Sequence, residues 1–249
     1  MRLDKYLALS GERSRSEAGK SVRGGCVRVN GNVIKDPAMR INETDLVTFS
    51  GELIENQANQ YIMLHKPTGV LTAARDKHAQ TVMDLLPQAL AKRKVLPVGR
   101  LDKDTTGLLL LTNDGVLAHR VLSPKSHVWK KYVATVEGML DQEDVEAFAE
   151  GLQLSDFEAM PAVLTICSAG VESSIAEVEI REGKFHQVKR MFGSRGHEVI
   201  KLHRSTFGSL TLPDDLPVGE YRPLTDDELA ALIGCSSATQ LTEEGLVDG

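Results

Sequence analysis

The chain has 249 residues, of which 41% are hydrophobic and 26% are charged, a balance that is typical of a folded globular protein and excludes a disordered chain. No apolar run reaches the roughly 20 residues that a membrane-spanning helix needs, and the first residues lack the apolar core of a secretion signal. We therefore expect a cytoplasmic protein without a membrane anchor. The cysteines, Cys26, Cys167 and Cys235, are too far apart to predict a metal site or a disulfide framework.

The net charge of −6 argues at first against a nucleic-acid partner, but the charge is unevenly distributed. Residues 225–249 hold six acidic residues and no Lys or Arg. By contrast, residues 2–28 contain seven basic and three acidic residues, and residues 181–204 contain seven basic and two acidic ones. Because a phosphate contact acts over a Debye length of about 8–10 Å, local basic patches decide RNA binding. The acidic total therefore does not exclude an RNA-binding protein.

Residues 1–58 predict a small separate domain. Apolar residues recur at helical spacing over residues 3–7 and 18–22, and the glycine pair 24–25 ends the second helix. Residues 26–29 alternate like a strand, and Asn30-Gly31 is a strong signal for a two-residue hairpin turn. A further strand is expected at 45–49, followed by a polar linker over 51–60.

The motifs of this domain resemble the S4 RNA-binding fold. They are RLDKYL at 2–7, SRS at 14–16, VRGG at 22–25 and VRVNG at 27–31. The basic side chains of the domain are Arg2, Lys5, Arg13, Arg15, Lys20, Arg23 and Arg28. We expect them to form a basic face that binds the phosphates of a folded RNA through its shape.

Residues 59–234 predict a second, larger domain. Strands are expected from residue 61 and at 108–111, 131–137, 162–167, 174–181 and 199–204, and helices at 116–122 and 141–151. The strands outnumber the helices and do not alternate with them regularly, which favours an α+β fold on a mixed, mostly antiparallel sheet with flanking helices. Residues 235–249 are polar and acidic, and we expect a disordered tail there.

The segment VGRLDKDTTGL at 98–108 is the most informative part of the chain. Asp102 and Asp104 lie in a turn that leads into the apolar run 108–111, and such turns often display functional groups. From these residues alone, the segment fits an ordinary charged surface loop or the paired carboxylates of a glycosidase. The neighbouring Arg100 and Lys103 make a cation site less favourable.

This segment resembles the signature of the RsuA-type pseudouridine synthases, in which the aspartate of GRLD is catalytic. The resemblance extends to KKY at 130–132 and to EGKFHQVKRMF at 182–192, and it covers nearly everything from Tyr61 to Leu232. It implies that Asp102 is the catalytic residue and that Tyr132 lies in the active site. It also implies that Lys189 pairs with Asp102.

The reaction that this resemblance implies breaks the N1–C1′ bond of a uridine, turns the base and joins C5 to C1′, without a metal or another cofactor. Asp102 would either attack the sugar or the base, or remove a proton from the sugar. Lys189 would lower the pKa of Asp102, and Tyr132 would stack on the base. The uridine must leave its helix to be reached. The residues expected to contact RNA are Arg2, Lys5, Arg13, Arg15, Arg23, Arg28, Arg100, Lys130, His186 and Arg190.

The third motif reads FHQVKRM, as in RsuA, whereas large-subunit enzymes of the group tend to read NRQ[IV]RRM. This favours a uridine in 16S ribosomal RNA, of the type at position 516, in naked RNA or in an assembly intermediate with ribosomal proteins. We expect a monomer. One alternative is a 23S ribosomal RNA site, as in the RluB, RluE and RluF enzymes. Others are a non-enzymatic S4-domain assembly factor and, least favoured, a sugar hydrolase.

Overall fold

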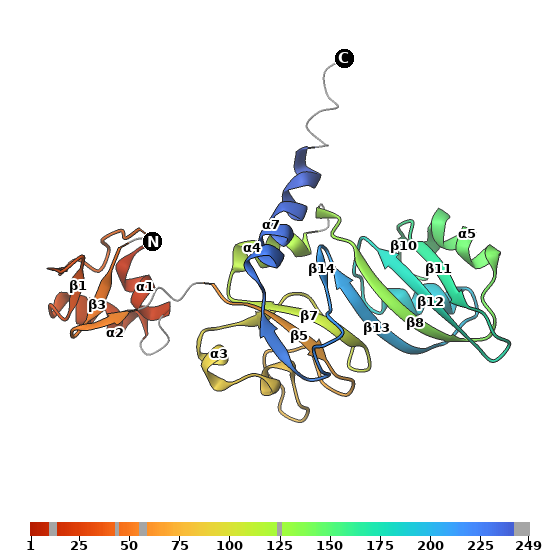
Figure 1. Ribbon diagram of the computed structural model, residues 1–249, viewed down its shortest axis with the longest axis horizontal. Helices are drawn as coiled ribbons and strands as arrows, with labels where there is room; N and C mark the ends of the chain where they lie inside the picture. Colours follow the sequence, from red (N-terminus) through yellow and green to blue (C-terminus); the bar gives the residue numbers. More distant parts are fainter. Residues whose placement is uncertain (10–13, 43–44, 55–58, 124–125, 242–249) are drawn as a thin grey trace, which may run out of the picture. The chain divides into compact units, whose positions relative to one another are not determined.

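The computed structural model describes residues 1–9, 14–42, 45–54, 59–123 and 126–241. The chain forms two compact units (Figure 1). The first unit comprises Met1–Gln60 and Pro87–Val95, and the second comprises Tyr61–Leu86 and Leu96–Gly249.

In the part of the chain that the structure describes, the first unit contains three helices and a small antiparallel sheet. Its elements are α1 (Leu3–Leu9), α2 (Arg15–Arg23), β1 (Val27–Val29), β2 (Asn32–Val33), β3 (Val47–Phe49), β4 (Glu52–Ile54) and the short helix α3 (Gln88–Lys92). The strand order is β2-β1-β3-β4. Asn30 and Gly31 both have positive φ, as the predicted hairpin turn requires. The linker predicted over 51–60 is wrong for residues 52–54, which pair with β3.

The start of α2 shows how local sequence fixes this unit. Ser14 and Glu17 form a capping box: the Ser14 hydroxyl accepts a hydrogen bond from the Glu17 amide, and the Glu17 carboxylate accepts one from the Ser14 amide. This satisfies two amides that no helical carbonyl can reach. The apolar side chains Leu3, Leu7 and Val22 then pack against the sheet in one buried cluster.

The second unit is built on a mixed, mostly antiparallel sheet of nine strands, which confirms the predicted fold class. Its strands are β5 (Tyr61–Lys66), β6 (Leu96–Pro97), β7 (Thr106–Thr112), β8 (Lys130–Glu137), β11 (Val163–Ser168), β12 (Ser173–Ile180), β13 (Val199–Phe207), β14 (Leu210–Thr211) and β15 (Tyr221–Pro223). The order is β11-β12-β8-β13-β7-β5-β15, with β14 on β13 and β6 on β7. The pairing of β7 with β13 is parallel.

Helices and a separate hairpin flank this sheet. They are the 3₁₀ helix η1 (Val82–Leu85), α4 (Gly115–Leu122), α5 (Gln142–Glu150), α6 (Gln187–Ser194) and α7 (Asp226–Leu241), with the hairpin β9 (Leu152–Gln153) and β10 (Glu158–Ala159). Helix α5 contacts β11, α6 contacts β13, and α7 contacts α4 and β14. Among the described helices, none is both long and apolar enough to cross a membrane.

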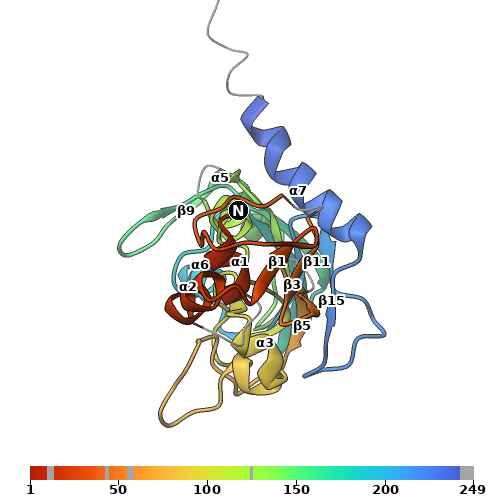
Figure 2. The ribbon, with the colours of Figure 1, turned by 90° about the vertical axis from the view of Figure 1, so that its left-hand side faces the viewer.

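The C-terminal helix departs from the sequence prediction. Residues 226–241 are helical, so the disordered tail expected from residue 235 is wrong up to Leu241; residues 242–249 lie outside the described residues. In two views the far end of α7 leads away from the sheet (Figure 1, Figure 2). Leu229 and Leu232, near its start, join the core beneath it. This packing, together with the acidic residues of the first turn, which favour a helix N-terminus, explains why a helix begins here.

The middle of the sheet places the functional loop. Leu108, Leu109, Leu110 and Leu111 are fully buried, as expected for a strand covered on both faces. Just before them, Gly107 has a φ of +109°, and a Cβ at this residue would lie 2.2 Å from the backbone oxygen of Arg204. Only glycine allows β7 to approach β13 this closely.

An ion pair fixes the first turn of α7, and its contribution to stability should depend on pH. Arg222 on β15 donates two hydrogen bonds of 2.7 Å to the Glu228 carboxylate, and Thr225 donates its amide to the same group. These contacts lower the pKa of Glu228 from 4.5 to about 2. Their stabilisation is therefore complete above about pH 4.5 and is lost as the pH falls toward 2.

We expect Glu228→Gln to lower the free energy of unfolding by about 1 kcal/mol at neutral pH and by clearly less near pH 3. Urea unfolding at both pH values measures the difference. Asp227→Asn, in the same helical turn but exposed, serves as the control and should change stability little. A Glu228→Gln deficit that does not depend on pH would contradict the role of this pair.

Candidate active site

Asp102 lies in the loop that connects β6 to β7, at the point where β7 meets β13. The backbone before it is held on both sides by one buried hydroxyl: Thr72 Oγ1 donates to the Leu101 oxygen over 2.8 Å and accepts from the Leu101 amide over 3.2 Å. The amide of Thr105 closes the turn by donating to the Asp102 oxygen. The Asp102 side chain is 27% exposed, so a fixed backbone presents a carboxylate that solvent and substrate can reach.

A buried lysine binds the backbone of this loop on the far side of Asp102. Lys66, at the end of β5, is fully buried, and its Nζ donates to the backbone oxygens of Pro67, Lys103 and Thr105 over 3.0, 3.2 and 2.9 Å. Burial lowers its pKa to about 8, against the opposing effect of the Asp104 and Asp102 carboxylates. Sequence reasoning missed Lys66, although a lysine that ends an apolar strand was the available signal.

Removal of the Lys66 amine should loosen the loop. We expect Lys66→Met to lower stability by about 1–3 kcal/mol, because three backbone carbonyls, of which that of Thr105 is buried, lose their donor, and to lower turnover through the misplaced loop. Thermal unfolding and a turnover assay measure the two effects. Lys103→Met is the control for stability, since the Lys103 side chain is exposed and its carbonyl still accepts from Lys66. A fully stable Lys66→Met protein would contradict this role.

The third sequence motif brings a histidine to Asp102. His186 precedes α6 and has a left-handed backbone with a φ of 50°. Its Nε2 lies 3.4 Å from Asp102 Oδ1, and the Phe185 ring stacks on its imidazole at a centroid distance of 3.8 Å. From the sequence, His186 was expected to contact RNA, and its pairing with the carboxylate was not predicted.

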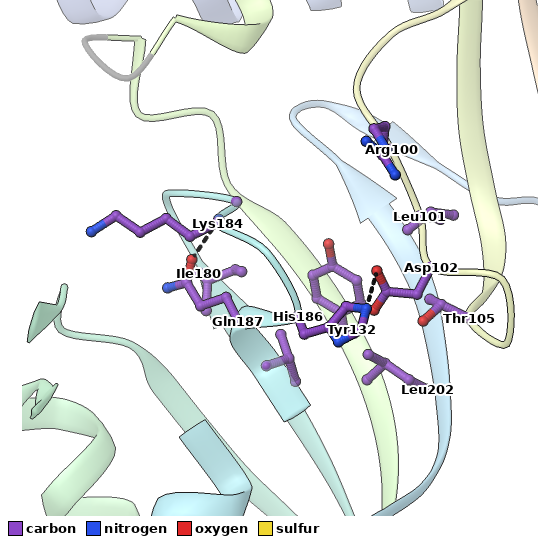
Figure 3. A pocket seen from close by; sticks show the side chains of 12 residues that line it. Arg100, Leu101, Asp102, Thr105, Tyr132, Ile180, Lys184, His186, Gln187 and Leu202 are labelled. Atoms are coloured by element: carbon purple, nitrogen blue, oxygen red, sulfur yellow. Dashed lines mark hydrogen bonds and ion pairs between the residues drawn. The ribbon is translucent and has the colours of Figure 1, made fainter. Parts of the chain in front are cut away.

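These residues line one pocket of about 400 Å³, the Asp102 pocket. Tyr132 of β8, only 7% exposed, forms part of its wall, and Figure 3 shows its ring beside the Asp102 carboxylate, with His186 reaching that carboxylate and Arg100 farther out along the loop. Leu101, Ile180, Val188 and Leu202 supply the apolar part of the lining. A flat ring, an apolar wall and one carboxylate suit a heterocyclic base held beside a group that can attack or take a proton.

A hydrogen-bond network holds the loop 181–186 that closes this pocket. The Gln187 side chain donates to Glu182 Oε1 over 2.7 Å and accepts from the Lys184 amide over 3.0 Å. The same carboxylate oxygen accepts from the Met160 amide over 2.8 Å. His186 therefore lies on a loop that is held in place by hydrogen bonds to Gln187 and Met160.

The pairing of Lys189 with Asp102 expected from the sequence is wrong. Lys189 Nζ lies 2.5 Å from Asp104 Oδ2 instead, and this contact lowers the pKa of Asp104. The position of Lys189 on α6 gives the reason. His186 faces Asp102, and Lys189 follows His186 by three residues, almost one helical turn. Lys189 therefore reaches Asp104, two residues after Asp102. Asp104, for which the resemblance implies no role, is thus part of the ionic framework around the site.

Only some of the predicted RNA-binding residues of the first unit lie together on one surface. Arg2, Arg15, Lys20 and Arg23 line one open hollow of about 750 Å³ together with Asp4 and Asp36. The Asp4 carboxylate is held by Arg2 and Arg15, and its hydrogen bonds, that from Arg2 above all, lower its pKa to about 2. Lys5 and Arg28 are exposed outside this lining, and Arg13 lies outside the described residues.

Of the remaining RNA-contact predictions, Arg100 lies at the Asp102 pocket. Lys130 is only 9% exposed and lines a neighbouring hollow. Arg190 points elsewhere: it pairs with Asp156 and covers the Phe157 ring near the β9–β10 hairpin. Within the described residues, no group of three or more His, Cys, Asp or Glu side chains could hold a metal ion.

Comparison with known proteins defines the class. Residues 60–194 match the family described as RNA pseudouridylate synthase, and residues 1–47 match the S4 domain. The chain belongs to the RNA pseudouridylate synthase family and is an enzyme of the RsuA type, which confirms the predicted activity class. The match in the first 47 residues confirms the predicted S4 domain.

Relatives resemble the chain over nearly its whole length. It is 42% identical to "Uncharacterized RNA pseudouridine synthase YtzG" of Bacillus subtilis (strain 168), over 93% of this chain and 98% of that protein. It is 39% identical to "Ribosomal small subunit pseudouridine synthase A" of Escherichia coli (strain K12), over 94% and 100%. A solved "Crystal structure of pseudouridylate synthase" superposes with a TM-score of 0.66 at 38% identity, over 93% and 99%.

Proposed function

We propose that this enzyme isomerises one uridine of 16S ribosomal RNA to pseudouridine, at the position equivalent to uridine 516, with Asp102 as its catalytic residue. The observation that carries the proposal is that Asp102, on a fixed loop, and Tyr132, on β8, line one pocket. The similarity to a relative named for the small ribosomal subunit supports the choice of RNA. The substrate is naked RNA or an assembly intermediate with ribosomal proteins, and the enzyme acts as a monomer in the cytoplasm.

In the proposed mechanism the ionised Asp102 starts the reaction, by attack on the sugar or the base or by removal of a sugar proton. The N1–C1′ bond breaks, the base turns within the pocket and C5 bonds to C1′; C5 then loses its proton to water and N1 takes up a proton, so that the product is an isomer of uridine. His186, whose Nε2 lies 3.4 Å from Asp102 Oδ1, holds the direction of this carboxylate. Tyr132 stacks on the base and has a hydroxyl for proton transfer near C5. Lys189 acts through Asp104, by holding the turn that carries Asp102.

The uridine reaches this pocket by leaving its helix, which costs a few kcal/mol. Basic side chains on the S4 domain, together with Arg100 and Lys130, offset this cost through phosphate contacts. We propose that the S4 domain of residues 1–58 binds folded RNA while residues 59–234 perform the chemistry. Both parts are then needed for efficient modification of a structured RNA.

A tritium-release assay tests the proposal. Ribosomal RNA made with [5-³H]uridine loses tritium to water when a uridine becomes a pseudouridine, because C5 exchanges its hydrogen for C1′. We expect release equivalent to about one uridine per small-subunit RNA, and none from large-subunit RNA. Release from large-subunit RNA alone would assign the 23S class instead. No release from naked RNA or from assembly intermediates would favour an assembly factor, and free uracil would indicate a hydrolase.

A further inference from the structure

Beside the Asp102 pocket lies a second hollow of about 750 Å³, the basic hollow. The two share Arg100, Tyr132, Gly183 and Lys184 in their linings, so a molecule that fills one adjoins the other. The basic hollow is lined by five basic side chains and a single acidic one. The basic ones are Arg100, Lys130, Arg181, Lys184 and Arg204.

The deepest of these cations lack full pairing within the protein. Arg204 is only 2% exposed; its Nε donates to the Leu108 oxygen, but its Nη2 is buried without a hydrogen-bond partner among the described residues. The Nε of Arg181 is also buried without one there. Lys130 donates only to a neutral group, the Val128 oxygen. Buried donors without partners cost free energy, which a suitable ligand would recover.

The acidic residue of the hollow does not neutralise this charge. Glu182 already accepts hydrogen bonds from Gln187 and the Met160 amide, and its other oxygen lies 3.6 Å from Lys184 Nζ. Burial, together with the nearby Arg204 cation, lowers the pKa of Lys130 to about 8. Lys130 therefore remains charged at neutral pH, and the basic hollow holds a net positive charge.

We propose that the basic hollow binds a phosphate group of the RNA that flanks the target uridine, through Lys130, Arg181 and Arg204. This rests on the proposed function and adds a phosphate subsite to it. A phosphate offers several acceptor oxygens to donors on different elements: Lys130 on β8, Arg204 on β13 and Arg181 just after β12. Held there, it would fix the sugar of the flipped nucleotide relative to Asp102, so the subsite would position the substrate as well as bind it.

Calorimetric titration of the full-length protein with uridine, 5′-UMP and 3′-UMP tests the subsite without relying on isomerisation. In wild-type protein we expect one of the two monophosphates to bind about 10-fold or more tightly than uridine, since charged hydrogen bonds to a phosphate are strong. We expect Arg181→Gln and Lys130→Gln to reduce this preference to about 3-fold or less while leaving the affinity for uridine similar. Arg120→Gln, on α4 and outside both linings, is the matched loss of charge and should keep the preference.

Arg181 is half-buried and its Nε has no partner among the described residues, so Arg181→Gln should fold normally, which circular dichroism checks. The subsite is overturned if neither monophosphate binds more tightly than uridine, or if both variants keep the wild-type preference. A phosphate preference that depends on Arg181, in a protein that releases no tritium from any RNA, would keep the subsite and reject the proposed function. Tritium release from small-subunit RNA, by a protein that binds neither monophosphate more tightly than uridine, would keep the proposed function and reject the subsite.

Discussion

Replacement of Asp102 with asparagine is expected to lower the rate of pseudouridine formation by at least about 10³-fold. Asparagine keeps the shape of the side chain but can neither attack a carbon nor take a proton. The backbone contacts that fix the loop come from Thr72 and Lys66 and do not involve this side chain, so the variant should fold and bind RNA as the wild type does. Single-turnover tritium release and an RNA-binding titration measure the two properties.

Asp104→Asn is the matched control for this experiment, because it removes the other carboxylate of the same turn. Asp104 is exposed and pairs with Lys189, and it is absent from the lining of the Asp102 pocket. We expect it to lower the rate by less than about 10-fold, the cost of a looser turn. Equal losses in both variants would show that the site depends on the pair of carboxylates, and the assignment of Asp102 alone would be wrong.

Replacement of Gly107 with alanine is expected to have the largest effect on stability. The added Cβ would lie 2.2 Å from the Arg204 oxygen and 2.6 Å from its nitrogen, at a φ of +109°. Backbone strain and overpacking together should cost roughly 3 kcal/mol or more, which lowers the unfolding temperature by about 6–12 °C in a protein of this size. Thermal unfolding, with activity at a permissive temperature, measures the effect.

Gly115→Ala provides the comparison. Gly115 begins α4, and a Cβ there would meet no atom within 4 Å. Alanine also favours the helix, so stability should stay the same or rise slightly. If both glycine variants melted like the wild type, the close approach of β7 and β13 would not constrain the fold.

The sequence predicted most of the fold because the relevant signals are local. The turn at Asn30-Gly31, the buried run Leu108–Leu111 and the alternation of β8 depend on neighbours in the chain, and each was found where expected. The helix at 235–241 was missed because its polar composition hid the packing of α7, near its start, on α4 and β14. The contact with α4 joins segments more than 100 residues apart, which periodicity does not report.

The residues of the site also fall into two groups, those predicted from the sequence and those that were missed. The resemblance placed Asp102 and Tyr132, and the structure brings them into one pocket. It did not foresee that His186, rather than Lys189, faces Asp102, because that depends on the left-handed backbone of His186 and the register of α6. Lys66 and Thr72 were missed because all but one of their partners, the backbone groups of Lys103, Thr105 and Leu101, lie about 30 to 40 residues away in the chain. Supports of this kind leave at most a weak local signal in a single sequence, such as the lysine that ends the apolar strand β5.

The most direct test of the central claim is a map of pseudouridine in ribosomal RNA from cells that lack the gene. We expect one pseudouridine of the small-subunit RNA to be missing, at the position equivalent to 516, and all those of the large subunit to remain. Wild-type protein and Asp104→Asn should restore it, and Asp102→Asn should not. An unchanged map would contradict the proposed modification of small-subunit RNA, and restoration by Asp102→Asn would contradict the catalytic role of Asp102.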